Sequence, residues 1–491
     1  MPRPIPLISK IVSGGLWSCF LRVVSRGMGL IRTLILARLL FPEDFGQIGI
    51  VMTIFTILDC VTQFGFTQAL MQRKGQDAGS LDTAWTASLL RSVALFLIVW
   101  GMAPAAAAFF RIDDLTALMR VVSVSILLNG LTNIGVVLFQ KELNFRQCFV
   151  LEAVPTFVDL VVSLAAAWYL RNVWALVWGG MAFNLSRLLL SFLLHPYRPA
   201  FRIDRVKFNE LFNFGKWVLL SGAVVTVITQ GDSVFVGKVF GAAALGCYQM
   251  AFLISNVLAT EITNTVSQVV FPSYSQIRED PRRLKEAFFR VFQFIAVICF
   301  PLSAGIFILS AEFSQLVLGA KWNAAVPLIQ IMSVLGCLRA FGGTAVALFW
   351  GIGVPRYALK YALVQLALLG ALIGPAAHVF GLEGVAAAVL LSYLALEVLY
   401  AFRLLSLLGA GWIQFIRILA VPLSASLGMV AVVGCAKEMV GPGTAGFAAL
   451  VAVGAGSYGV FLLILDSIFM ASQTRGMIAG LFAAVRRPLA E

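Results

Sequence analysis

The sequence has little charge and almost no histidine. Of its 491 residues, 12% are Asp, Glu, Lys or Arg and two are His, whereas 60% are hydrophobic. A soluble chain of this length would need more charged residues to cover its surface. Neither His195 nor His378 has a Cys, Asp or Glu at ligand spacing, and the seven cysteines are scattered singly without a CxxC pair. The sequence therefore predicts no metal site and no disulfide framework.

Motifs for nucleotide chemistry are missing as well. The stretch 441–446 matches G-x-G-x-x-G, but it contains a proline, lies between two apolar runs and follows no strand. No Walker A lysine is present. The net charge of +13 is not arranged as a basic stripe interleaved with aromatic residues, so a nucleic-acid partner is not expected. We expect no cofactor, apart from a coupling H⁺ or Na⁺, and no enzymatic activity.

Long apolar runs dominate the chain instead. They are continuous and show no period-2 alternation, which excludes an outer-membrane barrel. Each is long enough for a helix to cross a hydrocarbon core about 30 Å thick. The sequence predicts an all-α polytopic membrane protein with about fourteen spans, and twelve or thirteen if the weak cuts near 170–172 and 380–383 fail. The expected spans are 14–37, 45–70, 84–110, 118–140, 148–170, 172–195, 213–239, 243–272, 286–310, 326–351, 357–380, 383–407, 412–436 and 444–470.

The basic residues alternate between the connections. One set of connections, including both termini, carries 23 of the 36 Lys and Arg residues, and the other carries seven. Because Lys and Arg accumulate in cytoplasmic loops, this bias predicts that both termini lie in the cytoplasm.

A weak internal repeat relates the two halves. Gly46 matches Gly246 at an offset of 200 residues, and Arg146 matches Arg356 at an offset of 210. Six spans separate the copies, so the repeats are parallel, as in many transporters. The predicted organisation is an N-lobe (1–195), a cytoplasmic linker (196–212), a C-lobe (213–407), and two further helices with a cytoplasmic tail (408–491).

Arginines inside the predicted spans are candidate ligand-binding residues. A charge in mid-membrane costs roughly 2.5–3.5 kcal/mol on insertion scales, so it usually faces a polar interior. The first span carries Arg22, Arg26 and Arg32, and the third carries Arg91. Guanidinium groups bind phosphate through two parallel hydrogen bonds, which suits a pyrophosphate entering from the cytoplasm. The alternative is that these arginines fix helix orientation near the interface.

Acidic residues inside the spans are candidates for coupling or gating. Asp59, Asp159 and Glu261 would bind a proton or cation, or serve as structural partners of arginines. The repeat also aligns residues of opposite charge at equal depth, namely Arg32 with Asp232 and Arg187 with Glu397. We hypothesise that each pair closes a salt bridge between the halves; partners within one half, or side chains that snorkel, remain alternatives.

Several segments resemble one known family. "ILARLLFPEDFGQIGI" (35–50), "FGFTQALMQRKGQD" (64–77), "GDSVFVGKVFGAAALGCYQMAF" (231–252), "VFPSYSQIREDPRRLKEAFFR" (270–290) and "GAKWNAAVPLIQIM" (319–332) look like polysaccharide exporters of the multidrug/oligosaccharidyl-lipid/polysaccharide (MOP) transporter superfamily. The resemblance extends to about residue 410.

This resemblance implies a function. It implies two six-helix lobes around a cavity and flipping of an undecaprenyl-pyrophosphate-linked oligosaccharide across the bacterial inner membrane, for exopolysaccharide, O-antigen or capsule synthesis. Arg22, Arg26, Arg32 and Asp232 become plausible cavity residues, and the last two helices become a candidate lipid-tail groove. Membrane lipids and a polysaccharide polymerase or co-polymerase are candidate partners.

Other functions stay open at this point. A lipid II-type flippase differs only in its lipid, and a cation-coupled multidrug antiporter of the same superfamily would have an acidic cavity. A membrane scaffold of a glycan synthase complex would not need charges on many helices. A membrane glycosyltransferase usually needs an extramembrane domain, and no loop here is long enough for one.

Overall fold

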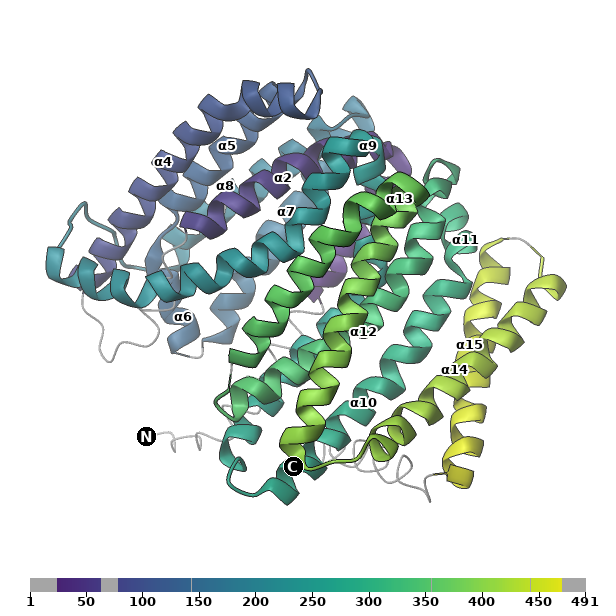
Figure 1. Cartoon of the computed structure of the whole chain (residues 1–491). Coiled ribbons are helices and arrows are strands. Elements are labelled where there is room, and N and C mark those ends of the chain that lie inside the picture. Colours follow the sequence, from purple (N-terminus) through teal and green to yellow (C-terminus); the bar gives the residue numbers. More distant parts are fainter. Residues whose placement is uncertain (1–23, 63–77, 143, 355, 442, 470–491) are drawn as a thin grey trace, which may run out of the picture. The chain divides into compact units, whose positions relative to one another are not determined.

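A computed structural model describes residues 24–62, 78–142, 144–354, 356–441 and 443–469 (Figure 1). These residues form helices and contain no strand. Residues 24–39 form the first described helix. The main later helices are α2 (Pro42–Thr62), α4 (Ala78–Phe110), α5 (Leu115–Leu131), α6 (Val137–Lys141), α7 (Phe145–Leu170), α8 (Trp174–Leu194), α9 (Arg205–Gln276), α10 (Pro281–Ile308), α11 (Ser310–Phe313), α12 (Val326–Gly351), α13 (Arg356–Leu408), α14 (Trp412–Met439) and α15 (Thr444–Phe469).

The prediction of a helical membrane protein is confirmed. Within the described residues, ten helices are long and apolar enough to cross a membrane, and α5 is a shorter apolar helix. Glycines interrupt the two longest helices: Gly241 in α9 has φ of 85° and Gly381 in α13 has φ of 60°. Glycine allows such a break because it adopts positive φ without a Cβ penalty. Both breaks lie between two predicted spans. The count of fourteen stays a prediction.

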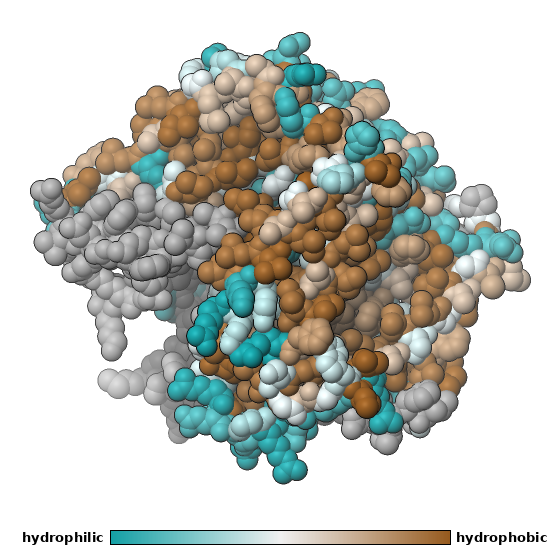
Figure 2. All heavy atoms as spheres, viewed as in Figure 1, coloured by the Kyte–Doolittle hydropathy of each residue, from teal (hydrophilic) through white to brown (hydrophobic). Residues whose placement is uncertain are grey.

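The chain divides into two compact units. Unit 1 comprises Met1–Gln249 and unit 2 comprises Met250–Glu491, so the division falls within α9. In unit 2 a large aromatic and aliphatic core joins α10, α12, α13 and α14. Figure 2 shows hydrophobic side chains along the middle of the helices of unit 2 and hydrophilic ones toward their ends. This pattern fits helices surrounded by lipid. The predicted lobe and linker boundaries stay a prediction.

Within unit 1, α2 crosses α9 at very close range. A Cβ added to Gly46 would lie 1.7 Å from the carbonyl oxygen of Ala242, and one added to Gly246 would lie 1.8 Å from that of Pro42. The 200-residue offset of the repeat relates Gly46 to Gly246 and Pro42 to Ala242. The two contacts are therefore the reciprocal contacts expected where equivalent helices meet on a pseudo-two-fold axis. This geometry supports the parallel repeat. We call this crossing of α2 and α9, with its contacts at Gly46 and Gly246, the glycine crossing.

Residues 195–204 form an extended strap that fastens the start of α4. The Tyr197 hydroxyl donates to Asp82, and the backbone N–H of Ala200 donates to the same carboxylate at 3.1 Å. The Asn133 side chain donates to the Tyr197 carbonyl at 2.6 Å. These hydrogen bonds hold the first residues of the predicted linker (196–212) in place. The rest of the predicted linker, residues 205–212, is helical, because α9 begins at Arg205 and continues into the next span.

At one end of the strap, His195 acts as a hydrogen-bond acceptor. Its Nδ1 accepts from the Tyr197 backbone N–H at 3.1 Å, which requires a ring unprotonated at that atom. Burial lowers the pKa of His195 below its usual 6.5; Glu142 opposes this shift and Arg198 adds to it. The folded state therefore favours neutral His195.

We predict that Gly246→Ala destabilises the protein. The new Cβ would meet a backbone carbonyl that cannot rotate away, so the helices must separate, at a cost of about 1–3 kcal/mol. The thermal midpoint of the detergent-purified protein, followed by tryptophan fluorescence, should fall by several degrees. Gly101→Ala is the control, because nothing lies within 4 Å of its added Cβ. Equal midpoints for the two variants would contradict the close crossing.

We also predict that the strap loosens in acid. Because the pKa of His195 is lower in the folded state, its stabilising contribution is complete above about pH 6.5 and declines as the pH falls below that value. The thermal midpoint of the wild type should therefore fall more between pH 7 and pH 5.5 than that of His195→Asn, which supplies a non-titrating acceptor. Parallel pH profiles would show that His195 does not contribute.

Candidate functional site

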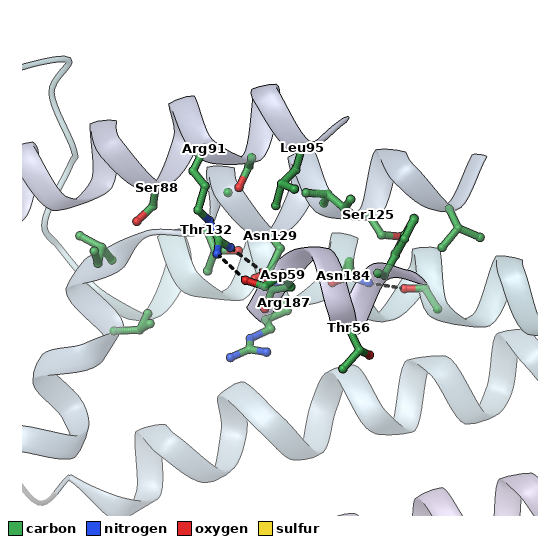
Figure 3. A pocket seen from close by; sticks show the side chains of 18 of the residues that line it. Thr56, Asp59, Ser88, Arg91, Leu95, Ser125, Asn129, Thr132, Asn184 and Arg187 are labelled. Carbon is green, nitrogen blue, oxygen red and sulfur yellow. Dashed lines mark hydrogen bonds and ion pairs between the residues drawn. The ribbon is translucent and has the colours of Figure 1, made fainter. Parts of the chain in front are cut away.

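A polar pocket lies inside unit 1. Its volume is about 580 Å³, and residues of α2, α4, α5, α7 and α8 line it (Figure 3). Its polar residues are Thr56, Asp59, Ser88, Arg91, Ser92, Ser125, Asn129, Thr132, Asn133, Glu152, Asn184 and Arg187. Polar groups at membrane depth are expensive, and they mark a site when several helices direct them into one space.

The pocket contains an ion pair between two predicted site residues. Arg91 on α4 donates through Nη2 to Oδ1 of Asp59 on α2 at 2.7 Å, and through Nη1 to the Asp59 backbone carbonyl at 3.5 Å. Figure 3 shows these side chains pointing toward each other. The Asp59 side chain is 50% exposed and that of Arg91 is 20% exposed. The pair is thus accessible from the pocket, and the two in-plane donors hold the guanidinium in a fixed orientation.

Arg187 brings a second guanidinium to the pocket. It extends from α8, and no described residue forms an ion pair or hydrogen bond with it. Asn129 on α5 and Asn184 on α8 line the same space, and Asn184 donates to the Gly180 carbonyl at 2.8 Å. The pocket therefore offers guanidinium donors beside side-chain amides. Such groups recognise phosphate oxygens and sugar hydroxyls.

Arg32 and Asp159 form a more buried ion pair outside this pocket. Nη1 of Arg32, in the helix of residues 24–39, donates to Oδ2 of Asp159 on α7. Their side chains are 23% and 13% exposed, respectively. Gly179 on α8 makes room for the carboxylate, since a Cβ there would lie 2.5 Å from Oδ1. The pair connects two helices far apart in sequence.

Asp232 has a different partner from the one hypothesised. It is buried on α9, and its Oδ2 accepts from the Tyr248 hydroxyl at 2.7 Å. With Arg32 bound to Asp159, the structure shows the alternative of partners within one half for Arg32. Arg187 and Glu397 belong to different units, so their proposed pairing stays a hypothesis. The roles assigned to these four residues in gating also stay predictions.

Four predicted site residues remain, namely Arg22, Arg26, Glu261 and Glu397. Arg22 lies outside the described residues. Arg26 is exposed on the first described helix. Glu261 is part of α9, in unit 2. Glu397 on α13 lies in an apolar groove of about 520 Å³ between α10, α12, α13 and α14, where its Oε1 has no hydrogen-bond partner. The structure thus brings Asp59, Arg91 and Arg187 together in one pocket.

Sequence reasoning missed the amides. The amides Asn129 and Asn184 line the polar pocket, and so does the acid Glu152, but none of the three was singled out. An amide in an apolar run costs less than a charge and gives a weaker signal. In the predicted span 118–140, Asn129 and Asn133 are four residues apart, a helical spacing that was the available clue, although α5 ends at Leu131 and Asn133 caps the short turn that follows.

We predict that the two ion pairs contribute unequally to stability. Asp159→Asn removes the charge of a mostly buried pair and should cost about 3 kcal/mol. Asp59→Asn removes a half-exposed charge and should cost about 1 kcal/mol or less. Thermal unfolding of the purified variants should therefore give a clearly lower midpoint for Asp159→Asn. The reverse order would show that the exposures do not set these energies.

The chain is similar in sequence to bacterial proteins of lipopolysaccharide and teichuronic acid biosynthesis. The chain is 24% identical to the lipopolysaccharide biosynthesis protein WzxC of Escherichia coli (strain K12), over 86% of each chain. It is 25% identical to the teichuronic acid biosynthesis protein TuaB of Bacillus subtilis (strain 168), covering 71% of this chain and 75% of TuaB.

Among solved structures, the lipid II flippase MurJ in an inward closed conformation shares the fold, with a TM-score of 0.76 and 15% identity over 93% of this chain and 99% of MurJ. The family model described as polysaccharide biosynthesis protein matches residues 35–327. Because this match covers more than half of the chain, the protein belongs to the polysaccharide biosynthesis protein family.

Proposed function

We propose that this protein flips an undecaprenyl-pyrophosphate-linked oligosaccharide from the cytoplasmic to the outer leaflet of the bacterial inner membrane by alternating access. The observation that carries the proposal is the polar pocket, where Asp59, Arg91 and Arg187 lie with amides among membrane-length helices. Membership of the polysaccharide biosynthesis protein family supports the glycan substrate. No covalent step is involved, so binding and conformational change suffice.

The polar pocket suits the head of such a substrate. A glycan offers many hydroxyls, and a diphosphate offers charged oxygens. Arg91 is fixed by Asp59, whereas Arg187 has its donors unengaged among the described residues. Arg187 is therefore the better candidate for the phosphates, and Asn129 and Asn184 for the sugar hydroxyls.

The apolar groove of unit 2 suits the lipid tail. Phe292, Phe300, Phe307 and Phe415 are among the side chains that line it, and α14 forms one of its walls. An isoprenoid chain has only apolar surface, and a groove of this composition would bind it by van der Waals contact. This assignment follows the predicted role of the helices after the repeats.

The charge bias supports the direction of transport. With 23 basic residues in one set of connections and seven in the other, both termini lie in the cytoplasm in our proposal. The strap of residues 195–204 then lies at the cytoplasmic end of α4. The glycan would be loaded on this side, and a polymerase or co-polymerase would receive it on the other.

A cation-coupled drug antiporter is the second candidate within the same fold. It would need acids available to bind a cationic drug. Asp59 and Asp159 instead accept from arginines, and Asp232 accepts from Tyr248. These partners favour an anionic substrate. A coupling H⁺ or Na⁺ remains part of the proposal, and its candidate acids are the predicted Glu261 and Glu397; the Oε1 atom of Glu397 has no hydrogen-bond partner among the described residues.

We predict that purified protein in proteoliposomes moves a fluorescent undecaprenyl-pyrophosphate oligosaccharide between leaflets. Access of the label to a membrane-impermeant quencher measures the movement. Arg187→Gln and Arg91→Gln should each slow it about tenfold or more, because each removes a charged hydrogen-bond donor from the pocket. Arg22→Ala/Arg26→Ala tests the predicted contribution of the first helix.

Arg278→Gln is the matched control. Arg278 is exposed, and its ion pair with Glu279 is long, at 4.0 Å. This variant should flip the lipid at the wild-type rate. If folded wild-type protein moved lipid II or ethidium but not the oligosaccharide lipid, under proton or sodium gradients, the proposal would be wrong and the corresponding alternative supported.

A further inference from the structure

Arg339 lies in the middle of the long apolar helix α12 of unit 2. A charge at such a position needs compensation. No ion pair or hydrogen bond of Arg339 occurs within the part of the chain that the structure describes. The guanidinium is nevertheless held in place, so its position calls for an explanation other than an acidic partner.

Two aromatic rings hold Arg339. Its Cζ lies 4.8 Å from the ring centroid of Phe252 on α9 and 5.7 Å from that of Tyr393 on α13. Rings attract a guanidinium through its charge and by stacking, and they use none of its N–H donors. The side chain is half-buried, and none of its nitrogens is both fully buried and without a partner. The donors therefore remain available to a ligand.

An acid is close by along the same helices but does not pair with Arg339. Glu397 lies one turn beyond Tyr393 on α13, and its Oε1 lies against Gly342, three residues beyond Arg339 on α12. The Oε1 atom has no hydrogen-bond partner. An arginine serving only to neutralise a buried acid would form that ion pair. Arg339 instead contacts only aromatic rings and has no acidic partner among the described residues, so its charge is available to an anion.

The repeat places Arg339 at a position equivalent to a pocket residue. The 210-residue offset relates Arg339 to Asn129 and Glu397 to Arg187. Asn129 and Arg187 both line the polar pocket of unit 1. The second repeat thus carries a guanidinium at a position where the first carries an amide that faces the candidate substrate site.

We propose that Arg339 binds a diphosphate group as a ligand contact of unit 2, held by Phe252 and Tyr393 so that its planar donors face the phosphate oxygens. This inference rests on the proposed function and adds to it a residue of the second repeat. Two parallel hydrogen bonds from one guanidinium give orientation as well as charge.

The test measures binding of undecaprenyl diphosphate to detergent-purified full-length protein by thermophoresis, with undecaprenol as a probe that lacks phosphate. Arg339→Gln should weaken undecaprenyl diphosphate binding about tenfold or more and leave undecaprenol binding unchanged. Arg339→Lys should show a smaller loss, because lysine keeps the charge but not the planar donors. Inorganic diphosphate is the third probe. If it displaces undecaprenyl diphosphate from the wild type, the diphosphate that Arg339 binds can also be a free anion.

Arg356→Gln is the control. Arg356 is also stacked on a ring in unit 2, with Cζ 5.3 Å from the Tyr357 centroid, but it is exposed. It should bind all probes as the wild type does. Wild-type affinity of Arg339→Gln, or equal weakening for undecaprenol, would overturn the assignment while leaving the proposed function standing. Failure of the wild type to bind undecaprenyl diphosphate would contradict both.

Discussion

The glycine crossing of α2 and α9 is the contact on which the arrangement of unit 1 depends. At Gly46 and Gly246 the backbone carbonyl of the partner helix occupies the space of a Cβ. In a membrane no hydrophobic effect drives apolar helices together, so close backbone approach supplies much of the packing energy. Because the two positions are equivalent in the repeat, the same contact, a glycine against a backbone carbonyl, forms twice at this crossing. A small, tightly packed crossing on a symmetry axis is also a suitable fulcrum for the rocking that our proposal requires.

The packing of the helices also determines which partners the charged side chains find. Helices that bury their backbone bonds internally can cross lipid, and charged side chains then need partners within the bundle. Arg32 finds Asp159 and Arg91 finds Asp59, each between helices distant in sequence. Arg187 and Arg339 have no acidic partner among the described residues. We assign a contact with an anionic group to each of them, to Arg187 in unit 1 and to Arg339 in unit 2.

Much of this architecture could be predicted from the sequence. The helix breaks at Gly241 and Gly381 fall at predicted span boundaries, because glycine between two apolar runs is a reliable local signal. The repeat offset located Gly46 and Gly246, whose contact the structure then shows. Local chemistry and periodicity are sufficient for such features.

The ion pairs between helices could not be predicted from the sequence in the same way. The hypothesis of Arg32 with Asp232 used equal depth alone, and depth leaves the rotation of each helix undetermined. Rotation depends on packing, here on the space that Gly179 leaves for Asp159. The contribution of Asn129 to the pocket was missed for a related reason, since an amide is conspicuous only when its neighbours in space are known.

The most direct test of the account is a comparison of substrates in proteoliposomes that contain only the wild-type protein. Leaflet transfer would be measured for an undecaprenyl-pyrophosphate oligosaccharide, for the same oligosaccharide on a neutral lipid, and for a cationic dye. The account predicts rapid protein-dependent transfer of the first and little of the other two. Transfer of the cationic dye alone, or equal transfer of the charged and neutral lipids, would contradict it.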